Sequence, residues 1–72
     1  MPYISVECGA LSSGQKTELI QKLTQTASEV MQVPQEFFTV TIKELPDLNF
    51  GIGGKTIDIV KAEYLQKHNA TD

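Results

Sequence analysis

A single helical pattern lies between two strand patterns, and this order limits the chain to few folds. Residues 3–8 alternate apolar and polar side chains with the period of two that a strand requires. Residues 12–33 have apolar side chains at helical spacing, and residues 37–45 are rich in aromatic and β-branched side chains. Strand, helix and strand make a βαβ unit, which predicts a parallel strand pair joined by a right-handed crossover.

The helix has signals at both ends. Ser12 and Gln15 have the spacing of a capping box, and Leu11 is the apolar residue before it. Pro34 stops the helix because it lacks an N–H and biases Val33 away from helical angles. The apolar stripe that we expect to pack consists of Leu19, Ile20, Leu23, Ala27, Val30 and Met31.

The second strand is expected to pack with one face and to leave the other face open. Alternation of side chains places Phe38, Val40 and Ile42 against the helix. The opposite face then carries Thr39, Thr41 and Lys43. A two-stranded sheet with one helix therefore keeps one face uncovered.

The last third of the chain begins with a turn at residues 46–49 and continues into a glycine-rich stretch. Gly51, Gly53 and Gly54 tolerate positive φ angles and allow close backbone approach, so we expect a glycine-rich turn or hairpin. Thr56 is placed to cap a short last helix, after which residues 67–72 are expected to fray. The apolar stripe expected on this helix is Ile57, Val60, Tyr64 and Leu65.

The length predicts a single domain, 1–72, that needs partners for stability. A chain of this size buries only about 60% of its unfolded surface. Cys8 is the only cysteine, which excludes a disulfide within the chain, and no Cys/His cluster has metal-binding spacing. The uncovered face and the edges of a parallel sheet are places where further subunits dock. We therefore expect a small α/β subunit that assembles into an oligomer.

The charge pattern argues against two classes of partner. The formal net charge is −3, and the 6 basic residues are all lysines, scattered among 9 acids. No basic stripe can follow a phosphate backbone, so we expect no nucleic acid partner. The N-terminus has no cationic segment before an apolar run, and no apolar run is long enough to span a membrane. We therefore expect a cytoplasmic protein with no membrane partner.

The residue after Met1 is the strongest candidate for chemistry. Aminopeptidases that remove the initiator methionine generally act when the next residue is small or proline, so Pro2 is expected to begin the mature chain. Its secondary amine is then a base aimed by a rigid ring, with little rotamer entropy to lose. A proline that merely begins an edge strand is the other interpretation.

A second motif imitates a nucleotide site. Gly54-Lys55-Thr56 matches the last three residues of a phosphate-binding loop, but Asn49 occupies the position of the first glycine of that motif. A glycine-rich turn or hairpin that packs on a neighbour explains these residues better.

The remaining reactive side chains are isolated. Cys8 has no histidine nearby in the sequence to activate its thiol, and a buried residue at a strand end is the simpler interpretation. His68, the only histidine, lies in the segment expected to fray, which makes it a poor general base. Glu7 and Glu44 stand alone, so a two-carboxylate hydrolase has little support.

Several of these features occur together in the 4-oxalocrotonate tautomerase family, which the chain resembles over nearly all of its length up to Gly54. The matching pieces are Met1-Pro2 at the start of an apolar strand, Ser12 to Lys16 opening the long helix, the strand from Val40 to Glu44, and the run from Asn49 to Gly54. The run from Pro46 to Lys55 is similar to a divergent, DmpI-like branch.

This resemblance implies a βαβ subunit assembled as a homohexamer, with Pro2 as the group that transfers a proton. The implied reaction converts an enol acid such as 2-hydroxymuconate into its conjugated keto isomer, without a cofactor or metal. An apolar pocket would lower the pKa of the Pro2 amine from the value of about 7.7–8.0 that is usual for an α-amino group. Phe50 is expected to form an apolar wall of that pocket.

The best-known members of the family use two arginines to hold the substrate, and this chain has none. The corresponding places are held by Ala10 or Leu11 and by Thr39. Lys43, on the face shared with Thr39, is the expected substitute, so Lys43 and Thr39 are candidate substrate contacts. Two alternatives stay open: a binding or structural oligomer that has lost turnover, and a hydratase or dehalogenase relative, which needs a group that activates water.

Overall fold

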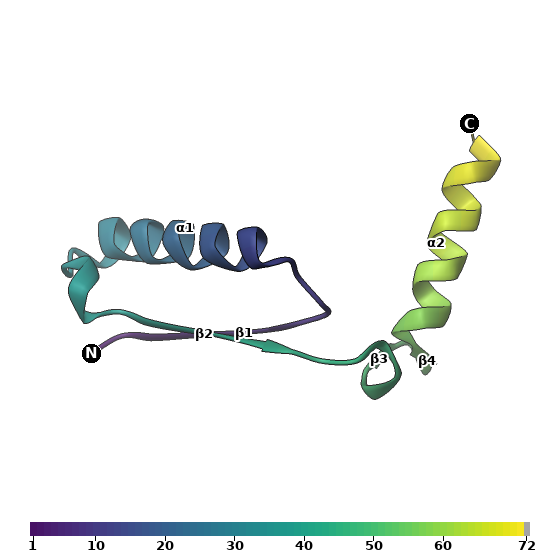
Figure 1. The fold of residues 1–72 in the computed structure, drawn as a ribbon, viewed down its shortest axis with the longest axis horizontal. Coiled ribbons are helices and arrows are strands. Elements are labelled where there is room, and N and C mark those ends of the chain that lie inside the picture. Colours follow the sequence, from purple (N-terminus) through teal and green to yellow (C-terminus); the bar gives the residue numbers. More distant parts are fainter. Residues whose placement is uncertain (72) are drawn as a thin grey trace.

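The computed structural model shows a body of two strands and a helix, followed by a C-terminal arm (Figure 1). It describes residues 1–71, with side chains for residues 1–67. The body contains β1 (Tyr3–Cys8), α1 (Ser13–Met31) and β2 (Thr39–Glu44). The arm contains β3 (Gly51–Ile52), β4 (Lys55–Thr56) and α2 (Ile57–Thr71). Short 3₁₀ turns precede β2 and β3, at Gln35–Phe37 and Asp47–Asn49.

The body is the predicted βαβ unit. β1 and β2 pair in parallel, with Tyr3 opposite Thr39 and Cys8 opposite Glu44. α1 crosses over one face of this sheet, as Figure 1 shows. The strand side chains under α1 are half-buried, namely Ile4, Val6, Val40 and Ile42. The other face is exposed, with Tyr3, Ser5, Thr39, Thr41 and Lys43, so the predicted alternation is confirmed.

The start of α1 also follows the prediction. Ser12 Oγ accepts a hydrogen bond from the N–H of Gln15 at 3.1 Å, and Gln15 Oε1 accepts one from the N–H of Ser12 at 2.9 Å. This capping box satisfies two N–H groups that a helix start leaves unpaired. At the other end α1 stops at Met31, and Gln32 takes a left-handed φ of 57° ahead of Pro34.

The half-buried apolar stripe of α1 is narrower than the stripe that the sequence predicts. Leu19 and Leu23 are half-buried, whereas Ile20, Val30 and Met31 are exposed, Val30 to 78%. Two paired strands lie only about 4.8 Å apart, so the sheet covers a narrow line along a helix whose apolar face is broader. The outer apolar side chains consequently stay at the surface of the subunit.

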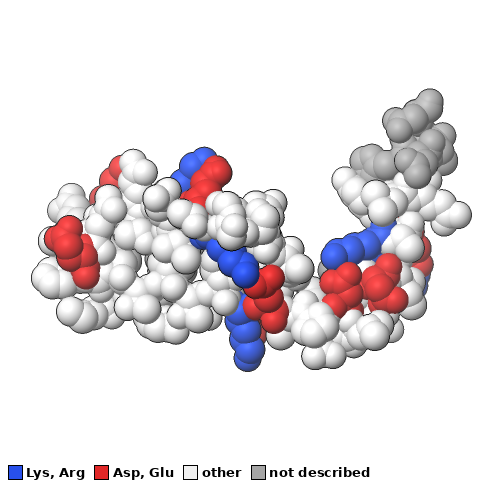
Figure 2. All heavy atoms as spheres, viewed as in Figure 1, with Lys and Arg blue, Asp and Glu red and all other residues white. Residues whose placement is uncertain are grey.

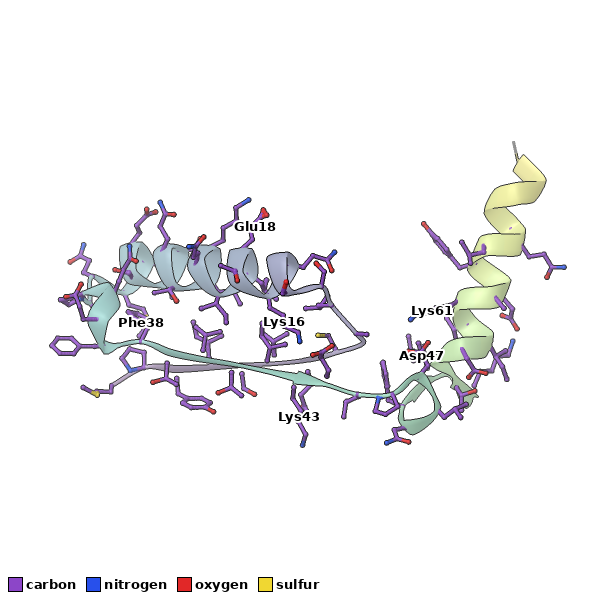
Figure 3. The ribbon with its side chains drawn as sticks, viewed as in Figure 1. Lys16, Glu18, Phe38, Lys43, Asp47 and Lys61 are labelled. Atoms are coloured by element: carbon purple, nitrogen blue, oxygen red, sulfur yellow. The ribbon has the colours of Figure 1, made fainter. Side chains whose placement is uncertain are left out.

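The strand expected over residues 37–45 is shorter in the structure. The N–H of Phe37 donates to the carbonyl oxygen of Pro34 at 3.1 Å, and that of Phe38 to Gln35 at 3.1 Å. These bonds close a 3₁₀ turn, so Phe37 lies before β2 and is 45% exposed. Phe38 is half-buried and lies on the α1 side of the sheet, as predicted (Figure 3).

The predicted glycine-rich hairpin is confirmed. Gly53 and Gly54 join the antiparallel strands β3 and β4 with φ angles of 61° and 85°. Positive φ at both positions of a two-residue loop is typical of a type I′ turn. A Cβ atom on Gly51 would stand 2.3 Å from the carbonyl oxygen of Lys55, so the hairpin needs glycine there as well.

α2 follows the hairpin directly and extends farther than expected. The prediction that residues 67–72 fray is wrong for the backbone up to Thr71, and Asp72 lies outside the described residues. No proline or glycine interrupts the sequence between Ile57 and Thr71, which explains the continuation. Within the described part of the chain, neither helix is long and apolar enough to cross a membrane.

Two ion pairs fasten α2 to the segment before it. Lys61 Nζ lies 3.0 Å from Oδ2 of Asp47, and Lys55 Nζ lies 2.8 Å from Oε1 of Glu63. Figure 3 shows Asp47 and Lys61 side by side. Ile57, 7% exposed, is the one buried hydrophobic residue among those described.

The arm projects away from the body, so the subunit is extended (Figure 1). Its radius of gyration is 16.2 Å, whereas a compact domain of this length has a value of about 11 Å. Large apolar side chains of the arm lie at the surface: Leu48, Ile52, Ile59, Tyr64 and Leu65. The chain therefore buries little apolar surface on its own.

Candidate active site

Pro2 lies at the edge of the sheet, directly before β1. Its carbonyl oxygen accepts a hydrogen bond from the N–H of Thr39 at 3.2 Å, which fixes the start of the chain to β2. Pro2 is half-buried, whereas Met1 is 96% exposed. With Met1 attached, the Pro2 nitrogen is an amide and has no basic lone pair. The exposed Met1 is accessible to an aminopeptidase, and its removal would leave a secondary amine anchored at this edge.

Pro2 borders an apolar cavity of about 520 Å³. Its other lining residues are Met1, Met31, Val33 and Phe37. They come from the residues before β1, the end of α1 with the loop after it, and the 3₁₀ turn before β2. None of their side chains carries a charge, so an amine placed here meets apolar side chains on the protein side.

Sequence reasoning missed Met31, Val33 and Phe37 as neighbours of Pro2. The signal that could have found them is topological. Parallel strands begin at the same edge of a sheet, so the crossover must bring the end of α1 and the start of β2 beside the start of β1. The structure shows this arrangement, with Tyr3 opposite Thr39.

Thr39 lies near Pro2, but Lys43 does not. Thr39 is bonded to Pro2 through its backbone N–H, and its side chain is exposed on the open face of the sheet. Lys43 is four positions farther along β2, about 13 Å away at about 3.3 Å per residue. It pairs in register with Glu7 and points away from α1 (Figure 3). Within one subunit Lys43 is therefore remote from the Pro2 nitrogen.

Phe50 is farther still. It follows the 3₁₀ turn Asp47–Asn49 at the base of the arm, and its carbonyl oxygen accepts a hydrogen bond from the N–H of Ile57 at 3.0 Å. β2 runs away from Pro2 toward the arm, as Figure 1 shows. A single subunit consequently does not bring Phe50 to the Pro2 cavity.

A second cluster lies where α1 begins. Glu44 accepts a hydrogen bond from the N–H of Leu11 at 3.0 Å, and its other oxygen pairs with Lys16. The Lys16 ammonium, followed by the Leu11 N–H, lowers the pKa of the Glu44 carboxyl below its usual value of 4.5. Both partners lie at the start of α1, so the cluster joins the end of β2 to α1. We assign it a structural role rather than a catalytic one.

The remaining lysines are largely engaged with acids. Lys16, Lys22, Lys55 and Lys61 each pair with a carboxylate. Figure 2 accordingly shows basic side chains beside acidic ones on the visible face, not a basic stripe. Lys55 pairs with Glu63 beside the hairpin turn, which supports the structural explanation of Gly54-Lys55-Thr56.

Cys8, the other reactive side chain that the structure describes, lies apart from Pro2. Cys8 is half-buried at the far end of β1. The side chain of His68 lies outside the described residues. Among the described side chains, no group of three or more His, Cys, Asp or Glu residues could hold a metal ion.

Comparison with known proteins connects this arrangement to one family. The family model described as "Tautomerase enzyme" matches residues 2–58. A probable tautomerase of Bacillus cereus is 33% identical over 58 residues, covering 79% of this chain and 95% of the relative. A probable tautomerase of Campylobacter jejuni is 28% identical over 65 residues, covering 88% and 96%.

Solved structures agree with the sequence comparison. The crystal structure of DmpI from Archaeoglobus fulgidus is 35% identical with a TM-score of 0.76, covering 79% of this chain and 98% of that one. The matched region of the family model begins at Pro2 and ends within the first turn of α2. On these grounds the chain belongs to the tautomerase family, among the homologues of 4-oxalocrotonate tautomerase and DmpI.

Proposed function

We propose that this protein is a tautomerase that moves a proton between the enol and keto forms of a small unsaturated 2-hydroxy acid such as 2-hydroxymuconate, with Pro2 as general acid and base. The observation that carries the proposal is the position of Pro2: tied to β2 by a backbone hydrogen bond, behind an exposed Met1, and beside an apolar cavity. Membership of the tautomerase family supports it.

The proposed reaction needs a neutral amine. After Met1 is removed, the Pro2 nitrogen accepts the proton of the 2-hydroxyl group. The O–H electron pair then forms the carbonyl, the double bonds shift along the chain, and a distal carbon takes the proton back from the Pro2 ammonium. Met31, Val33 and Phe37 favour the neutral amine because apolar surroundings disfavour the charged form.

Self-association is part of the proposal. Phe50 as an apolar wall and Lys43 as a substrate contact lie away from Pro2 within one subunit, so they can serve the site only from a partner copy. Thr39, bonded to Pro2 in the same subunit, is the proposed contact that needs no partner. The uncovered sheet face and the extended arm support an assembly of several copies, and we propose a homohexamer.

A kinetic comparison of wild type with Pro2→Ala tests this function. Intact mass first establishes that Met1 has been removed from both proteins. A panel of enol acids, including 2-hydroxymuconate, is then followed by the absorbance of the keto product. A positioned acid and base contributes about 10²–10⁴-fold, so kcat/KM of the variant should fall by that factor. Equal rates for the two proteins would refute the catalytic role of Pro2.

One observation favours a second candidate, a binding oligomer without turnover. The cavity beside Pro2 has no charged side chain that could polarise a substrate carbonyl. On this alternative wild type shows no rate above buffer with any enol acid of the panel, while the assembly forms normally. The hydratase or dehalogenase alternative has weaker support, since none of the residues that line the cavity beside Pro2 carries a second base that could activate water.

A further inference from the structure

Phe50, the hairpin and α2 form one connected unit. The carbonyl oxygen of Phe50 accepts a hydrogen bond of 3.0 Å from the N–H of Ile57, the buried first residue of α2. Both carboxylate oxygens of Asp47 accept hydrogen bonds from the Lys61 ammonium, at 3.2 and 3.0 Å. A copy of the chain that brings Phe50 to the Pro2 cavity of its partner therefore brings α2 with it.

The base of the arm is anchored on the body at the end of the sheet remote from this cavity. A Cβ atom on Gly9, in the loop after β1, would stand 3.8 Å from Oδ1 of Asp47 and 3.9 Å from Nζ of Lys61. The N–H of Leu45 donates to the carbonyl oxygen of Cys8 at 2.7 Å. Since the cavity lies at the start of β1 and these contacts lie beyond its end, α2 does not cover the cavity of its own subunit.

Most of α2 lies outside the part of the chain that the tautomerase family model matches. The match ends at residue 58, whereas α2 continues to Thr71. This continuation carries the exposed apolar side chains Ile59, Tyr64 and Leu65, and it stands clear of the body (Figure 1). Exposed apolar surface of this kind marks a contact with another protein surface.

One side of α2 combines an aromatic ring with an available cation. A hollow of about 560 Å³ is lined by Val60, Glu63, Tyr64, Gln66 and Lys67. Glu63 is already paired with Lys55, and among the described residues Lys67 pairs with no carboxylate. The Lys67 ammonium is therefore available to an anion, with the amide of Gln66 as a second donor.

This hollow and the Pro2 cavity are complementary. None of the side chains that line the cavity carries a charge, whereas the hollow supplies a cation. A carboxylate that enters an apolar cavity needs a counter-charge, because an unpaired charge in such surroundings is costly. At about 1.5 Å per residue, α2 places Lys67 about 15 Å from Ile57 along its axis. A helix that lies across the mouth of the cavity thus carries this ammonium past the apolar lining, to the side open to water.

We propose that α2 of a partner copy covers the Pro2 cavity, and that Lys67 of the partner subunit binds the carboxylate of the substrate. The inference rests on the proposed function and adds to it a substrate-binding residue and the copy that supplies it. One copy contributes the amine and its apolar wall. The other contributes the cation and the ring of Tyr64, which closes the cavity from the partner side.

Kinetics of Lys67 variants test the contact. In Met1-free protein, Lys67→Ala should raise KM for 2-hydroxymuconate by about 10- to 100-fold, as for a hydrogen bond to a charged group, with little change in kcat. Lys67→Arg keeps the charge and should keep KM close to that of wild type. Lys22→Ala is the matched control, because it removes the same charge from an exposed pair on α1 and should leave KM unchanged. Equal KM values for Lys67→Ala and Lys22→Ala would overturn the inference.

Mixed assemblies show which copy supplies the cation. Pro2→Ala lacks the amine, and Lys67→Ala lacks the cation. When the two proteins are unfolded and refolded together, some sites combine Pro2 of one copy with Lys67 of the other. Activity at low substrate concentration should then exceed the sum for the two proteins mixed without refolding. No gain in assemblies that native mass spectrometry shows to be mixed would overturn the assignment to a partner copy.

Binding without turnover separates this inference from the proposed function. Wild type and Lys67→Ala are titrated with glutarate, an unreactive dicarboxylate, and followed by NMR, and we expect weaker binding by the variant. If no enol acid is converted but glutarate binding depends on Lys67, the catalytic proposal fails and the assignment of Lys67 stands. If turnover depends on Pro2 while neither KM nor glutarate binding depends on Lys67, only this inference is wrong.

Discussion

The backbone N–H of Leu11 donates a hydrogen bond of 3.0 Å to Oε2 of Glu44, which joins the loop before α1 to the last residue of β2. The other carboxylate oxygen of Glu44 pairs with Lys16 in the first turn of α1 (Figure 3). One side chain therefore holds both the loop and the helix that follow β1. This matters in a subunit that buries so little apolar surface.

Replacement of Glu44 by Gln should lower the stability of the body. The amide keeps a carbonyl oxygen for Leu11 but loses the charge that pairs with Lys16, so we expect Tm to fall by several degrees. Glu18→Gln is the control, because Glu18 forms an exposed i,i+4 pair with Lys22 and such pairs contribute little. Thermal unfolding followed by circular dichroism checks both variants. A fall in Tm that is no greater for Glu44→Gln than for Glu18→Gln would contradict the structural role of the cluster.

The same carboxyl group should make the fold sensitive to acid. Hydrogen bonding to Lys16, followed by that to Leu11, lowers the pKa of Glu44 in the folded state below its usual value of 4.5. A group of this kind stabilises the fold above its unfolded pKa, and the contribution is lost as pH falls through the folded pKa. The difference in Tm between wild type and Glu44→Gln should be constant above pH 4.5 and shrink below it. A difference that grows on acidification would show that the direction of the shift is wrong.

The features that could be predicted from the sequence are those determined by residues close together in the chain. Ser12 and Gln15 are three positions apart and satisfy each other's backbone N–H groups. The hairpin depends on Gly53 and Gly54, whose positive φ angles suit glycine. Alternation in β2 identified the face that packs under α1, and the side chains of β1 alternate in the same way under this helix.

The cavity could not be predicted in the same way. The sequence pattern places Phe37 in a strand. In the structure its N–H donates a hydrogen bond to the carbonyl oxygen of Pro34, and its side chain lines the cavity beside Pro2. Lys43 and Phe50 were assigned to the site by resemblance, and within one subunit they lie toward the end of the body opposite to Pro2. No local sequence pattern indicates which copy of the chain a side chain will contact. The assignment of Lys43 and Phe50 to the site therefore stays a proposal.

Steric crowding makes Gly51→Ala a test of the hairpin. The added Cβ would stand 2.3 Å from the carbonyl oxygen of Lys55, a backbone atom that can move only if β3 and β4 separate. We expect a loss of about 1–3 kcal/mol in the free energy of unfolding, as for other overpacked sites. Gly14→Ala is the matched control in α1, where the nearest atom is 4.0 Å away. This change should stabilise the helix by up to about 1 kcal/mol. Urea unfolding measures both effects, and equal effects of the two changes would exclude the close contact at Gly51.

Stability should depend on protein concentration. Leu48, Ile52 and Tyr64 are exposed on the arm, at 72%, 64% and 60%, and the sheet has an uncovered face. If copies of the chain cover these surfaces, association stabilises the folded state, and Tm rises with concentration by mass action. Thermal unfolding over a hundredfold range of concentration, with the mass measured by analytical ultracentrifugation, checks this. Dilution should lower Tm over the same concentration range in which the assembly dissociates, because a separate subunit retains little buried apolar surface. A constant Tm with the mass of one chain would show that the extended subunit is stable alone, and the proposed assembly would then be wrong.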